Sequence, residues 1–364
     1  MGLQAGIVGL PNVGKSTLFN ALTNAGAESA NYPFCTIEPN VGIVPVPDSR
    51  LQQLETVIQT QKVLPATVEI VDIAGLVKGA SKGEGLGNQF LGNIRTVDAI
   101  LHVVRCFDSD DIHHVDGSVD PIRDIETIEM ELIFKDMESV EKRIQRHQKI
   151  AKSGDKAARF HMDVAQKMMA MLEEGKLIRS GSWTEEQWES IVDAQLITSK
   201  PILFVCNVDE EGLAEENAHV KAVRAHASQL ESHLISICAQ AEAELSELDP
   251  EERVEFLQDL GIEEPGLDRL ARETYHLLGL QTYFTAGEKE IRAWTIQQGW
   301  KAPAAAGVIH TDFEKGFIKA EVYTIPDLLK LGSEGALRTA GRLRIEGKEY
   351  VVQDGDVMHF RFNV

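Results

Sequence analysis

The 364-residue sequence lacks long apolar runs and a leader-like beginning. No apolar run approaches the ~20 residues that a membrane-spanning helix requires. The first residues, Met1–Gly6, lead directly into a predicted strand, without the basic segment and apolar core that are typical of a secretory signal. We therefore expect no membrane segment and a cytoplasmic location.

The sequence also has few cysteines and a strong excess of one charge. Cys35, Cys106, Cys206 and Cys238 are widely spaced and match no metal-ligand spacing, so we expect free thiols in a reducing compartment. The formal net charge of −21 argues against nonspecific binding of nucleic acid over the surface as a whole. The distribution of the charge therefore matters more than its sum.

A phosphate-binding loop is the strongest motif in the sequence. The segment Gly9–Ser16 fits the pattern G-x-x-x-x-G-K-[ST] and lies between a short apolar run and a predicted helix. Glycines let the backbone wrap so that N–H groups face phosphate oxygens, and the helix N-terminus adds its positive dipole end. A chance match in a surface loop is the alternative, and the flanking elements argue against it. The residues expected to bind the phosphates are Asn12, Val13, Gly14, Lys15, Ser16 and Thr17.

Two further segments predict a magnesium-dependent nucleotide switch. Thr36 lies in the loop after the first helix, and Asp72-Ile73-Ala74-Gly75 fits the pattern D-x-x-G at the end of a predicted strand. Mg²⁺ prefers a few oxygen ligands plus water, so we expect Ser16, Thr36 and Asp72 to hold it. The Gly75 N–H is expected to contact the γ-phosphate. Each motif is weak alone, and their order along the chain favours the switch.

The turn Asn207-Val208-Asp209-Glu210 stands where guanine-specific proteins carry N-K-x-D. Val208 replaces the lysine that packs across the base, and Glu210 is one methylene longer than the aspartate that pairs with guanine. Adenine is therefore the better prediction for the base. The expected base-pocket residues are Asn207, Val208 and Glu210, with Cys238 and Ala239 after the next strand. A plain strand-to-helix connection is the alternative for this turn.

The catalytic group is the least determined part of the predicted site. Leu76 stands where many such switches place a water-orienting glutamine, so we expect slow hydrolysis or catalysis by another group. His114 lies in an acidic loop from which a histidine could approach the γ-phosphate, and the predicted catalytic residues are Lys15, Gly75 and His114. A solvated loop histidine is the alternative for His114. Asn12 could hold K⁺ beside the phosphates, which makes K⁺ a second candidate cofactor.

A helical segment interrupts the strands. Strands that alternate with helices predict a parallel, doubly wound α/β sheet, in which ligands bind at the carboxyl ends of the strands. Between about 124 and 200, two apolar stripes at helical spacing flank Ser153-Gly154-Asp155, which predicts an antiparallel helical hairpin. Its basic tip suits a phosphate backbone, and a solvated helix face is the alternative. The basic residues are Lys142, Arg143, Arg146, Lys149, Lys152, Lys156 and Arg159.

The composition changes again at about Leu278, where a small α+β domain is expected to begin. Gly316–Tyr323 and Gly355–Phe362 have the alternating polarity of strands. Leu343–Ile345 and Tyr350–Val352 flank a glycine turn, which predicts a β-hairpin.

With these motifs in view, the sequence resembles the YchF/Obg-like ATPase family among the translation-factor-type P-loop proteins. The resemblance covers essentially the full length and rests on Gly9–Ser16, Asn31–Asn40, Asp72–Gly92, Asn207–Glu210 and Gly355–Phe362. It implies a preference for ATP over GTP, slow hydrolysis and a hydrophobic residue in the glutamine position. It also implies association with ribosomes, with the large subunit and ribosomal RNA as the expected contacts. The last segment resembles a TGS domain of β-grasp fold.

The predicted fold is a P-loop NTPase doubly wound sheet with an inserted antiparallel helical hairpin and a C-terminal β-grasp domain. The ATPase domain would comprise 1–128 and 200–277, the hairpin 129–199 and the TGS domain 278–364. We expect a monomeric Mg²⁺-dependent ATPase whose nucleotide state controls ribosome binding. The alternatives are a translation-factor-type GTPase, a nearly inactive nucleotide-gated ribosome adaptor, and a small-molecule kinase. D-x-x-G and Thr36 argue against the kinase.

Overall fold

The computed structural model describes residues 2–27, 40–73, 86–109, 111–115 and 117–363. Cys35, Thr36, Gly75 and Leu76 lie outside these ranges, as does most of the loop before Asn40. The chain forms two compact units. The first contains Met1–Gly42 and Glu69–Leu270, and the second contains Ile43–Val68 and Ala271–Val364. The segment Ile43–Val68, which the sequence division placed within 1–128, is therefore part of the C-terminal unit.

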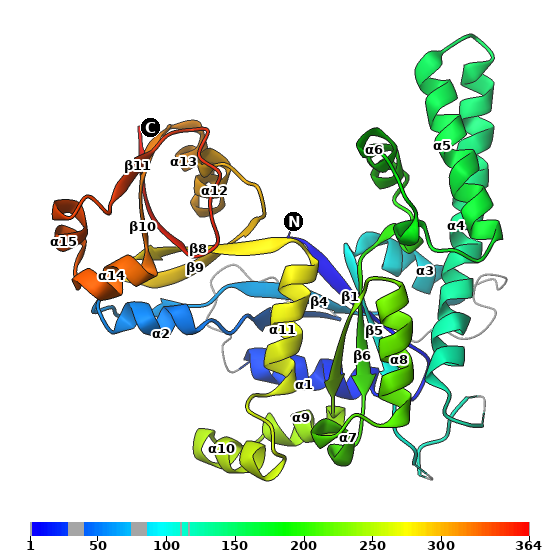
Figure 1. Cartoon of the computed structure of the whole chain (residues 1–364), viewed down its shortest axis with the longest axis horizontal. Helices are drawn as coiled ribbons and strands as arrows, with labels where there is room; N and C mark the ends of the chain where they lie inside the picture. The colour runs from blue at the N-terminus through cyan, green and yellow to red at the C-terminus, as the bar shows by residue number, and fades with distance from the viewer. Residues whose placement is uncertain (1, 28–39, 74–85, 110, 116, 364) are drawn as a thin grey trace. The chain divides into compact units, whose positions relative to one another are not determined.

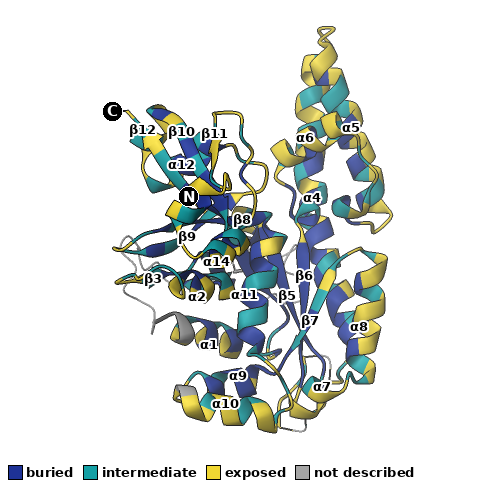
Figure 2. Cartoon of the chain, turned by 60° about the vertical axis from the view of Figure 1, so that its left-hand side comes forward, coloured by how far each residue is buried: buried dark blue, intermediate teal, exposed yellow. Residues whose placement is uncertain are grey.

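A six-stranded sheet of order β2-β4-β1-β5-β6-β7 forms the core of the first unit (Figure 1). Strand β1 pairs in parallel with β4 and β5, and β6 pairs in parallel with β5 and β7. Every residue of β5 and β6 is buried, because both faces of such a sheet are covered (Figure 2). This confirms the predicted doubly wound sheet. The strands are β1 (Gln4–Val8), β2 (Val41–Pro45), β4 (Thr67–Asp72), β5 (Ala99–Arg105), β6 (Ile202–Asn207) and β7 (His233–Ile237).

Helices of the first unit pack on this sheet. Helix α1 contacts β1 and α9, α8 contacts β6 and β7, and the first part of α4 contacts β5. Helix α11 spans the division between the two units. The helices outside the hairpin are α1 (Lys15–Ala27), α3 (Leu86–Thr96), α7 (Glu210–Ala214), α8 (Ala218–Gln229), α9 (Ala239–Leu245), α10 (Pro250–Asp259) and α11 (Gly266–Leu277).

The predicted helical hairpin is present as α4 (Pro121–Ala151) and α5 (Lys156–Glu173). Gly154 adopts a φ of +88° in the turn, a value that a residue with a Cβ rarely takes, and Asp155 caps α5. Apolar residues of both helices form one core with the segment that follows α5. That segment contains η1 (Ile178–Ser180), α6 (Glu185–Ala194) and η2 (Ile197–Ser199).

A buried carboxylate fixes η2 to the hairpin. Asp136 of α4 is fully buried and accepts hydrogen bonds from Ile197 N at 3.0 Å, Thr198 N at 2.7 Å and Thr198 Oγ1 at 2.7 Å. Burial raises the pKa of Asp136, and these hydrogen bonds oppose the rise. The start of β6 is thereby held against the hairpin.

The second unit contains a six-stranded sheet of order β11-β10-β12-β8-β9-β3. Strands β8 and β9 are antiparallel, β10 is antiparallel to β11 and β12, and β12 is parallel to β8. Helix α12 packs Ala302, Ala305 and Ala306 into a core with residues of this sheet, which is the arrangement of a β-grasp fold. The strands are β3 (Val63–Leu64), β8 (Leu280–Ala286), β9 (Ile291–Gln297), β10 (Phe317–Thr324), β11 (Arg344–Glu346) and β12 (Asp356–Phe362). The helices are α2 (Ser49–Glu55), α12 (Ala302–Ile309), α13 (Thr311–Lys315), α14 (Ile325–Leu331) and α15 (Glu334–Thr339).

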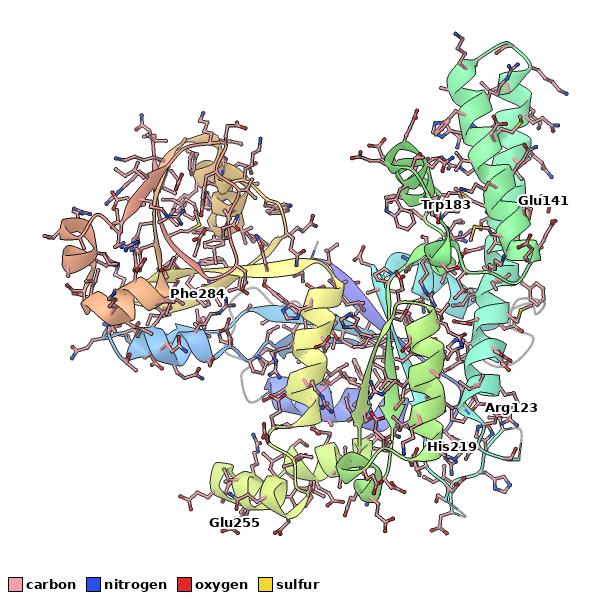
Figure 3. All side chains as sticks on the ribbon, viewed as in Figure 1. Arg123, Glu141, Trp183, His219, Glu255 and Phe284 are labelled. Atoms are coloured by element: carbon pink, nitrogen blue, oxygen red, sulfur yellow. The ribbon has the colours of Figure 1, made fainter. Side chains whose placement is uncertain are left out.

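Arg50 explains why the segment Ile43–Val68 belongs to the second unit. Its NH1 lies 2.6 Å from Asp354 Oδ2, across 304 residues of sequence, and its Nε donates to Asp48 Oδ1 at 2.8 Å. The guanidinium also lies over the ring of Phe284, at 5.0 Å from its centroid; Phe284 is labelled in Figure 3. Short-range sequence patterns cannot predict such a pairing.

The expected β-hairpin around Gly347 is wrong. Strand β11 pairs with β10, and Val351 forms only an isolated bridge with Lys301. Asp356 Oδ2 accepts hydrogen bonds from the Tyr350 hydroxyl at 2.7 Å and from Gln353 N at 3.0 Å. The Tyr350 hydroxyl also accepts a hydrogen bond from Arg344 NH2 of β11 at 3.1 Å, so the two segments meet through side chains and not through a β-ladder.

None of the helices in the described part of the chain is long and apolar enough to cross a membrane. Cys106, Cys206 and Cys238 are free and buried. A hydrogen bond with Cys206, together with burial, raises the pKa of Cys106, so this thiol is poorly reactive.

A buried polar cluster joins β5 to the base of the hairpin. His102 of β5 is 2% exposed, and its ring lies 5.6 Å from that of Phe204. Arg179 NH2 lies 3.3 Å from Glu129 Oε1, and His226 Nε2 lies 3.9 Å from Glu129 Oε2. Burial lowers the pKa of His102 to about 4; Glu129 opposes this shift, and Arg179 and His226 add to it. His102 is therefore neutral at pH 7.

We expect His102 to make the first unit sensitive to acid. Because its pKa is lower in the folded than in the unfolded chain, stability is present above pH ~6.5 and is lost as the pH falls toward 4. The free energy of unfolding should fall by about 2 kcal/mol between pH 7 and 5 through this residue alone. Urea unfolding of His102→Gln at both pH values should show a smaller loss than the wild type, whereas exposed His233→Gln should match the wild type. Equal losses in His102→Gln and the wild type would contradict the assignment.

Candidate functional site

The predicted phosphate loop occupies the connection between β1 and α1. Asn12 and Gly14 adopt φ values of 62° and 100°, in the left-handed region. A Cβ at Gly9 would lie 2.5 Å from Val103 O, and a Cβ at Gly14 would overlap the Asn207 amide nitrogen. Other parts of the chain therefore approach Gly9 and Gly14 too closely for a side chain at either position. Helix α1 begins at Lys15.

Lys15 lies inside this loop. Its side chain is 7% exposed, and Nζ donates to Leu10 O at 2.6 Å. Burial lowers the pKa of Lys15 to about 8, and Asp72 opposes this change. An anionic ligand would therefore be a more favourable partner for the buried Lys15 ammonium group than the single Leu10 carbonyl oxygen.

Asp72, one of the predicted magnesium ligands, lies at the end of β4. Its register partner on β1 is Ile7, directly before the loop. Burial raises the pKa of Asp72, and Lys15 opposes this change. Ser16 and Thr17 are exposed at the start of α1. A serine hydroxyl and a carboxylate are hard oxygen donors, which fits Mg²⁺.

The described residues contain no group of three or more His, Cys, Asp or Glu side chains that could hold a metal ion. Thr36 and Gly75, predicted to contact the metal and the γ-phosphate, lie outside the described residues.

Asn207 connects the phosphate loop to the expected base pocket. It ends β6 and is 7% exposed. Its Nδ2 donates to Val13 O at 2.9 Å, and its Oδ1 accepts from Ala239 N at 3.0 Å. The Asn207 amide thus forms hydrogen bonds with a carbonyl group of the loop and with an N–H group at the start of α9. The structure brings Asn207, Val13, Gly14 and Ala239 together.

The other base-pocket residues differ in their environment. Val208 is 2% exposed, and its N–H donates to Ile237 O at 2.9 Å, so its side chain is part of the core. Glu210 is exposed at the first position of α7, which Asp209 caps through Gly212 N. Cys238 is the buried N-cap residue of α9, and burial raises its pKa.

The ring of the predicted catalytic histidine is in contact with a carboxylate. His114 Nε2 lies 2.8 Å from Asp124 Oδ2, and these side chains are only 5% and 4% exposed. The neighbouring residue contacts the phosphate loop, because Asn12 Nδ2 donates to His113 O at 3.3 Å. The geometry thus places the backbone of His113, and not the ring of His114, against Asn12.

Arg105 organises the loop that carries both histidines, and the sequence analysis did not identify it. It is 1% exposed at the end of β5. Its guanidinium donates to Phe107 O at 3.1 Å, to Ile112 O at 2.8 Å and to Ser109 O at 3.2 Å. The sequence signal that could have identified Arg105 is its place as a charged residue at the end of the largely apolar strand β5. Arg123, labelled in Figure 3, donates to Ser118 O at 2.6 Å at the other end of this loop.

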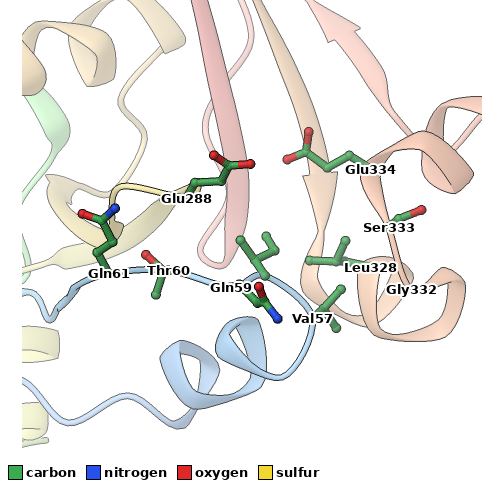
Figure 4. Close-up of a pocket in the computed structure, with 10 residues that line it drawn as sticks. Val57, Gln59, Thr60, Gln61, Glu288, Leu328, Gly332, Ser333 and Glu334 are labelled. Carbon is green, nitrogen blue, oxygen red and sulfur yellow. The ribbon is translucent and has the colours of Figure 1, made fainter.

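A separate pocket of about 590 Å³ lies in the second unit (Figure 4). It is lined by residues 57–61, by Glu288 and by Glu334, and none of its described lining residues is a lysine or arginine. Glu334 Oε1 already accepts from the Tyr323 hydroxyl at 2.7 Å and lies 2.8 Å from His359 Nε2. The pocket has no charge that would favour a phosphate.

Comparisons with known proteins agree along the whole chain. Residues 4–143 match the family model MMR_HSR1, described as "50S ribosome-binding GTPase", and residues 280–363 match YchF-GTPase_C, described as a protein of unknown function. The chain is 58% identical over 364 residues to the "Ribosome-binding ATPase YchF" of Haemophilus influenzae, with 100% of both chains covered. The chain belongs to the YchF family.

Other members support this assignment. The YchF proteins of Bacillus subtilis and Escherichia coli O157:H7, both named "Ribosome-binding ATPase YchF", are 58% identical over 366 residues and 55% identical over 364 residues, each with full coverage. A solved structure described as the Schizosaccharomyces pombe YchF GTPase superposes with a TM-score of 0.90 at 40% identity, covering 99% of this chain and 97% of that chain. The resemblance seen in the sequence is confirmed. The bacterial relatives are named ribosome-binding ATPases, whereas the solved structure is titled a GTPase.

We expect Asn207→Asp to weaken nucleotide binding at least tenfold, by about 1.4 kcal/mol or more. The substitution removes the donor to Val13 O and sets a carboxylate against that carbonyl, which displaces the phosphate loop. Isothermal titration calorimetry with ATP measures the effect.

Asn217→Asp is the matched control. Asn217 Nδ2 donates to Cys106 O at 2.7 Å and its Oδ1 accepts from Val220 N at 2.9 Å, a similar bridge outside the loop. It should lower stability without lowering affinity. Wild-type affinity in Asn207→Asp would show that the bridge does not position the loop.

Proposed function

We propose that the protein is a Mg²⁺-dependent ATPase that hydrolyses ATP slowly and binds the ribosome according to its nucleotide state. The observation that carries this proposal is the Asn207 bridge between the phosphate loop and the start of α9. It joins the elements that would hold the phosphates to those that would hold the base, so that one nucleotide can span both.

The base pocket supports adenine. Val208 is directed into the core and cannot pack across a base as a lysine does. Glu210 begins a helix and is exposed, so the carboxylate that would pair with guanine is not held in a buried position. A site that leaves the guanine ring N–H and amino group unpaired rejects that base. The bacterial relatives that are named ATPases agree with this choice.

The phosphate end supports a metal-dependent hydrolase. Loop N–H groups and Lys15 would bind the phosphate oxygens, and Ser16, Asp72 and Thr36 would hold Mg²⁺. The bound ion would neutralise charge on the phosphates. Lys15 would then exchange the Leu10 carbonyl for a phosphate oxygen, which restores a full counter-charge to a buried ammonium group.

Hydrolysis would be limited by the group that activates water. Leu76 cannot orient water, and the His114 ring is held by Asp124. His114 would act only after this pair opens, with Gly75 and Lys15 stabilising the γ-phosphate. Asn12, which has a left-handed φ of 62°, would supply an amide oxygen to K⁺ beside the phosphates. A nearly inactive nucleotide-gated adaptor is the second candidate, because the His114–Asp124 pair favours a poor catalyst.

The hairpin tip supports binding to a phosphate backbone. Six of its seven basic residues are exposed, and the seventh, Arg143, pairs with Asp193 at 2.9 Å. The tip therefore has a concentrated positive charge on a chain of net charge −21. We propose the RNA of the large ribosomal subunit as its partner, with the protein acting as a monomer in the cytoplasm. The exposed residues are Lys142, Arg146, Lys149, Lys152, Lys156 and Arg159.

We expect ATP to bind at least tenfold more tightly than GTP, because the exposed Glu210 would leave the ring N–H and amino group of guanine unpaired. Calorimetry with both nucleotides measures this difference, and tighter binding of GTP would overturn the assignment.

Turnover of ATP, measured in K⁺ and in Na⁺, should be slow alone and faster with ribosomes. His114→Ala should remove the increase, whereas Asp124→Asn, which removes the carboxylate charge beside the ring, should not. Turnover that is unchanged by ribosomes and by His114→Ala would favour the adaptor.

We expect charge reversal at Arg146, Lys149 and Lys152 to glutamate to weaken ribosome co-sedimentation. Each lost phosphate contact should also flatten the dependence of log affinity on log salt by about 0.7–0.9, so three should flatten it by about 2–3. The same reversal at exposed Lys221, Lys289 and Lys348 is the matched control for net charge. Wild-type affinity and salt dependence in the tip variant would make the tip a solvated helix face.

A further inference from the structure

Helix α6 is held rigidly on the hairpin. Thr184 and Gln187 form a capping box at its start, and Ile191 is buried against the hairpin core. Ser190 is 2% exposed; its Oγ lies 2.9 Å from His161 Nδ1 and accepts from Arg143 NH2 at 3.3 Å. The outer face of α6 is therefore preorganised, and the helix would lose little conformational freedom when a partner binds.

The outer face of α6 combines an exposed apolar pair with acidic residues. Trp188 is 39% exposed and Val192 is 60% exposed, and they lie one helical turn apart on the same side. An exposed tryptophan beside another apolar residue is typical of a protein interface. The helix contains no lysine or arginine, and its exposed acids are Glu185, Glu186, Glu189 and Asp193.

A groove of about 460 Å³ runs between α6 and the start of α5. Glu186, Glu189 and Asp193 line it from α6, and Phe160 and Lys156 line it from α5. Lys156 supplies the positive charge among the described lining residues, against Glu186 and Glu189, while Asp193 pairs with Arg143. An apolar floor beside carboxylates suits the stem and head of a lysine or arginine side chain.

We propose that α6 and this groove bind a basic protein segment of the ribosome, with an apolar residue on Trp188 and Val192 and a lysine or arginine in the groove. The inference rests on the proposed ribosome binding and adds a protein contact to it. A phosphate backbone would be repelled by Glu185, Glu186 and Glu189 of α6, so RNA would bind at the tip. The hairpin thus presents a basic tip to nucleic acid and an acidic, apolar side to protein.

A photo-crosslinking residue, p-benzoylphenylalanine, placed at 188 tests this contact with purified ribosomes. The same residue at Val254 is the matched control, because α10 is also an acidic, capped helix with an exposed valine; its Glu255 is labelled in Figure 3. We expect position 188, but not 254, to crosslink to a ribosomal protein at a segment that contains lysine or arginine. Crosslinks to ribosomal RNA, to a second copy of the chain, or to nothing while ribosomes remain bound would overturn the proposal.

Sedimentation separates this contact from the tip. Trp188→Ala with Val192→Ala should weaken ribosome binding about tenfold without changing its salt dependence, because no phosphate contact is lost. Val254→Ala should bind as the wild type does, and wild-type affinity in the double variant would contradict the proposal. If the wild type fails to bind ribosomes, the proposed function fails. In that case, ribosomal proteins freed of RNA serve as the probe. A crosslink from position 188 to a basic segment would support the inference, and the absence of a crosslink would overturn it.

Discussion

The hydrogen bonds of the Asn207 side chain are the constraint on which the site depends. A single amide holds a carbonyl of the phosphate loop and the first N–H of α9, and the loop leaves no room for a Cβ at Gly14. The loop, β6 and α9 therefore keep one relative position. Preorganisation of this kind lowers the cost of binding a nucleotide, because the pocket does not need to assemble around it.

Sequence patterns predicted the parts of the molecule that local order determines. The phosphate loop, the strands of the first sheet and the helical hairpin follow from glycine spacing and apolar periodicity. What they could not predict depends on partners far away in the chain. Arg50 draws the segment Ile43–Val68 to the second unit through Asp354, and Asp124 holds the ring of His114. The role of Arg105 appears only when the carbonyl groups of the folded loop surround it.

Charge is divided on the hairpin in a way that its composition hides. Exposed lysines and arginines gather at the turn between α4 and α5, while α6 carries acids and an exposed tryptophan. Arg143 joins the two regions, since it lies in the basic stretch but pairs with Asp193 of α6. An extension that is basic at its end and acidic along its side can distinguish RNA from protein on a mixed surface.

Helix α4 also has a mechanical consequence. It runs without interruption for 31 residues from the end of the loop that carries His114 to the hairpin tip, as Figure 1 shows, and Asp124 lies in its first turn. At 1.5 Å per residue it is a lever about 46 Å long. A tilt of about 5° at its base would displace its far end by about 4 Å, which exceeds the length of a hydrogen bond. A small rearrangement beside the phosphates would therefore be amplified into the gain or loss of contacts at a remote surface.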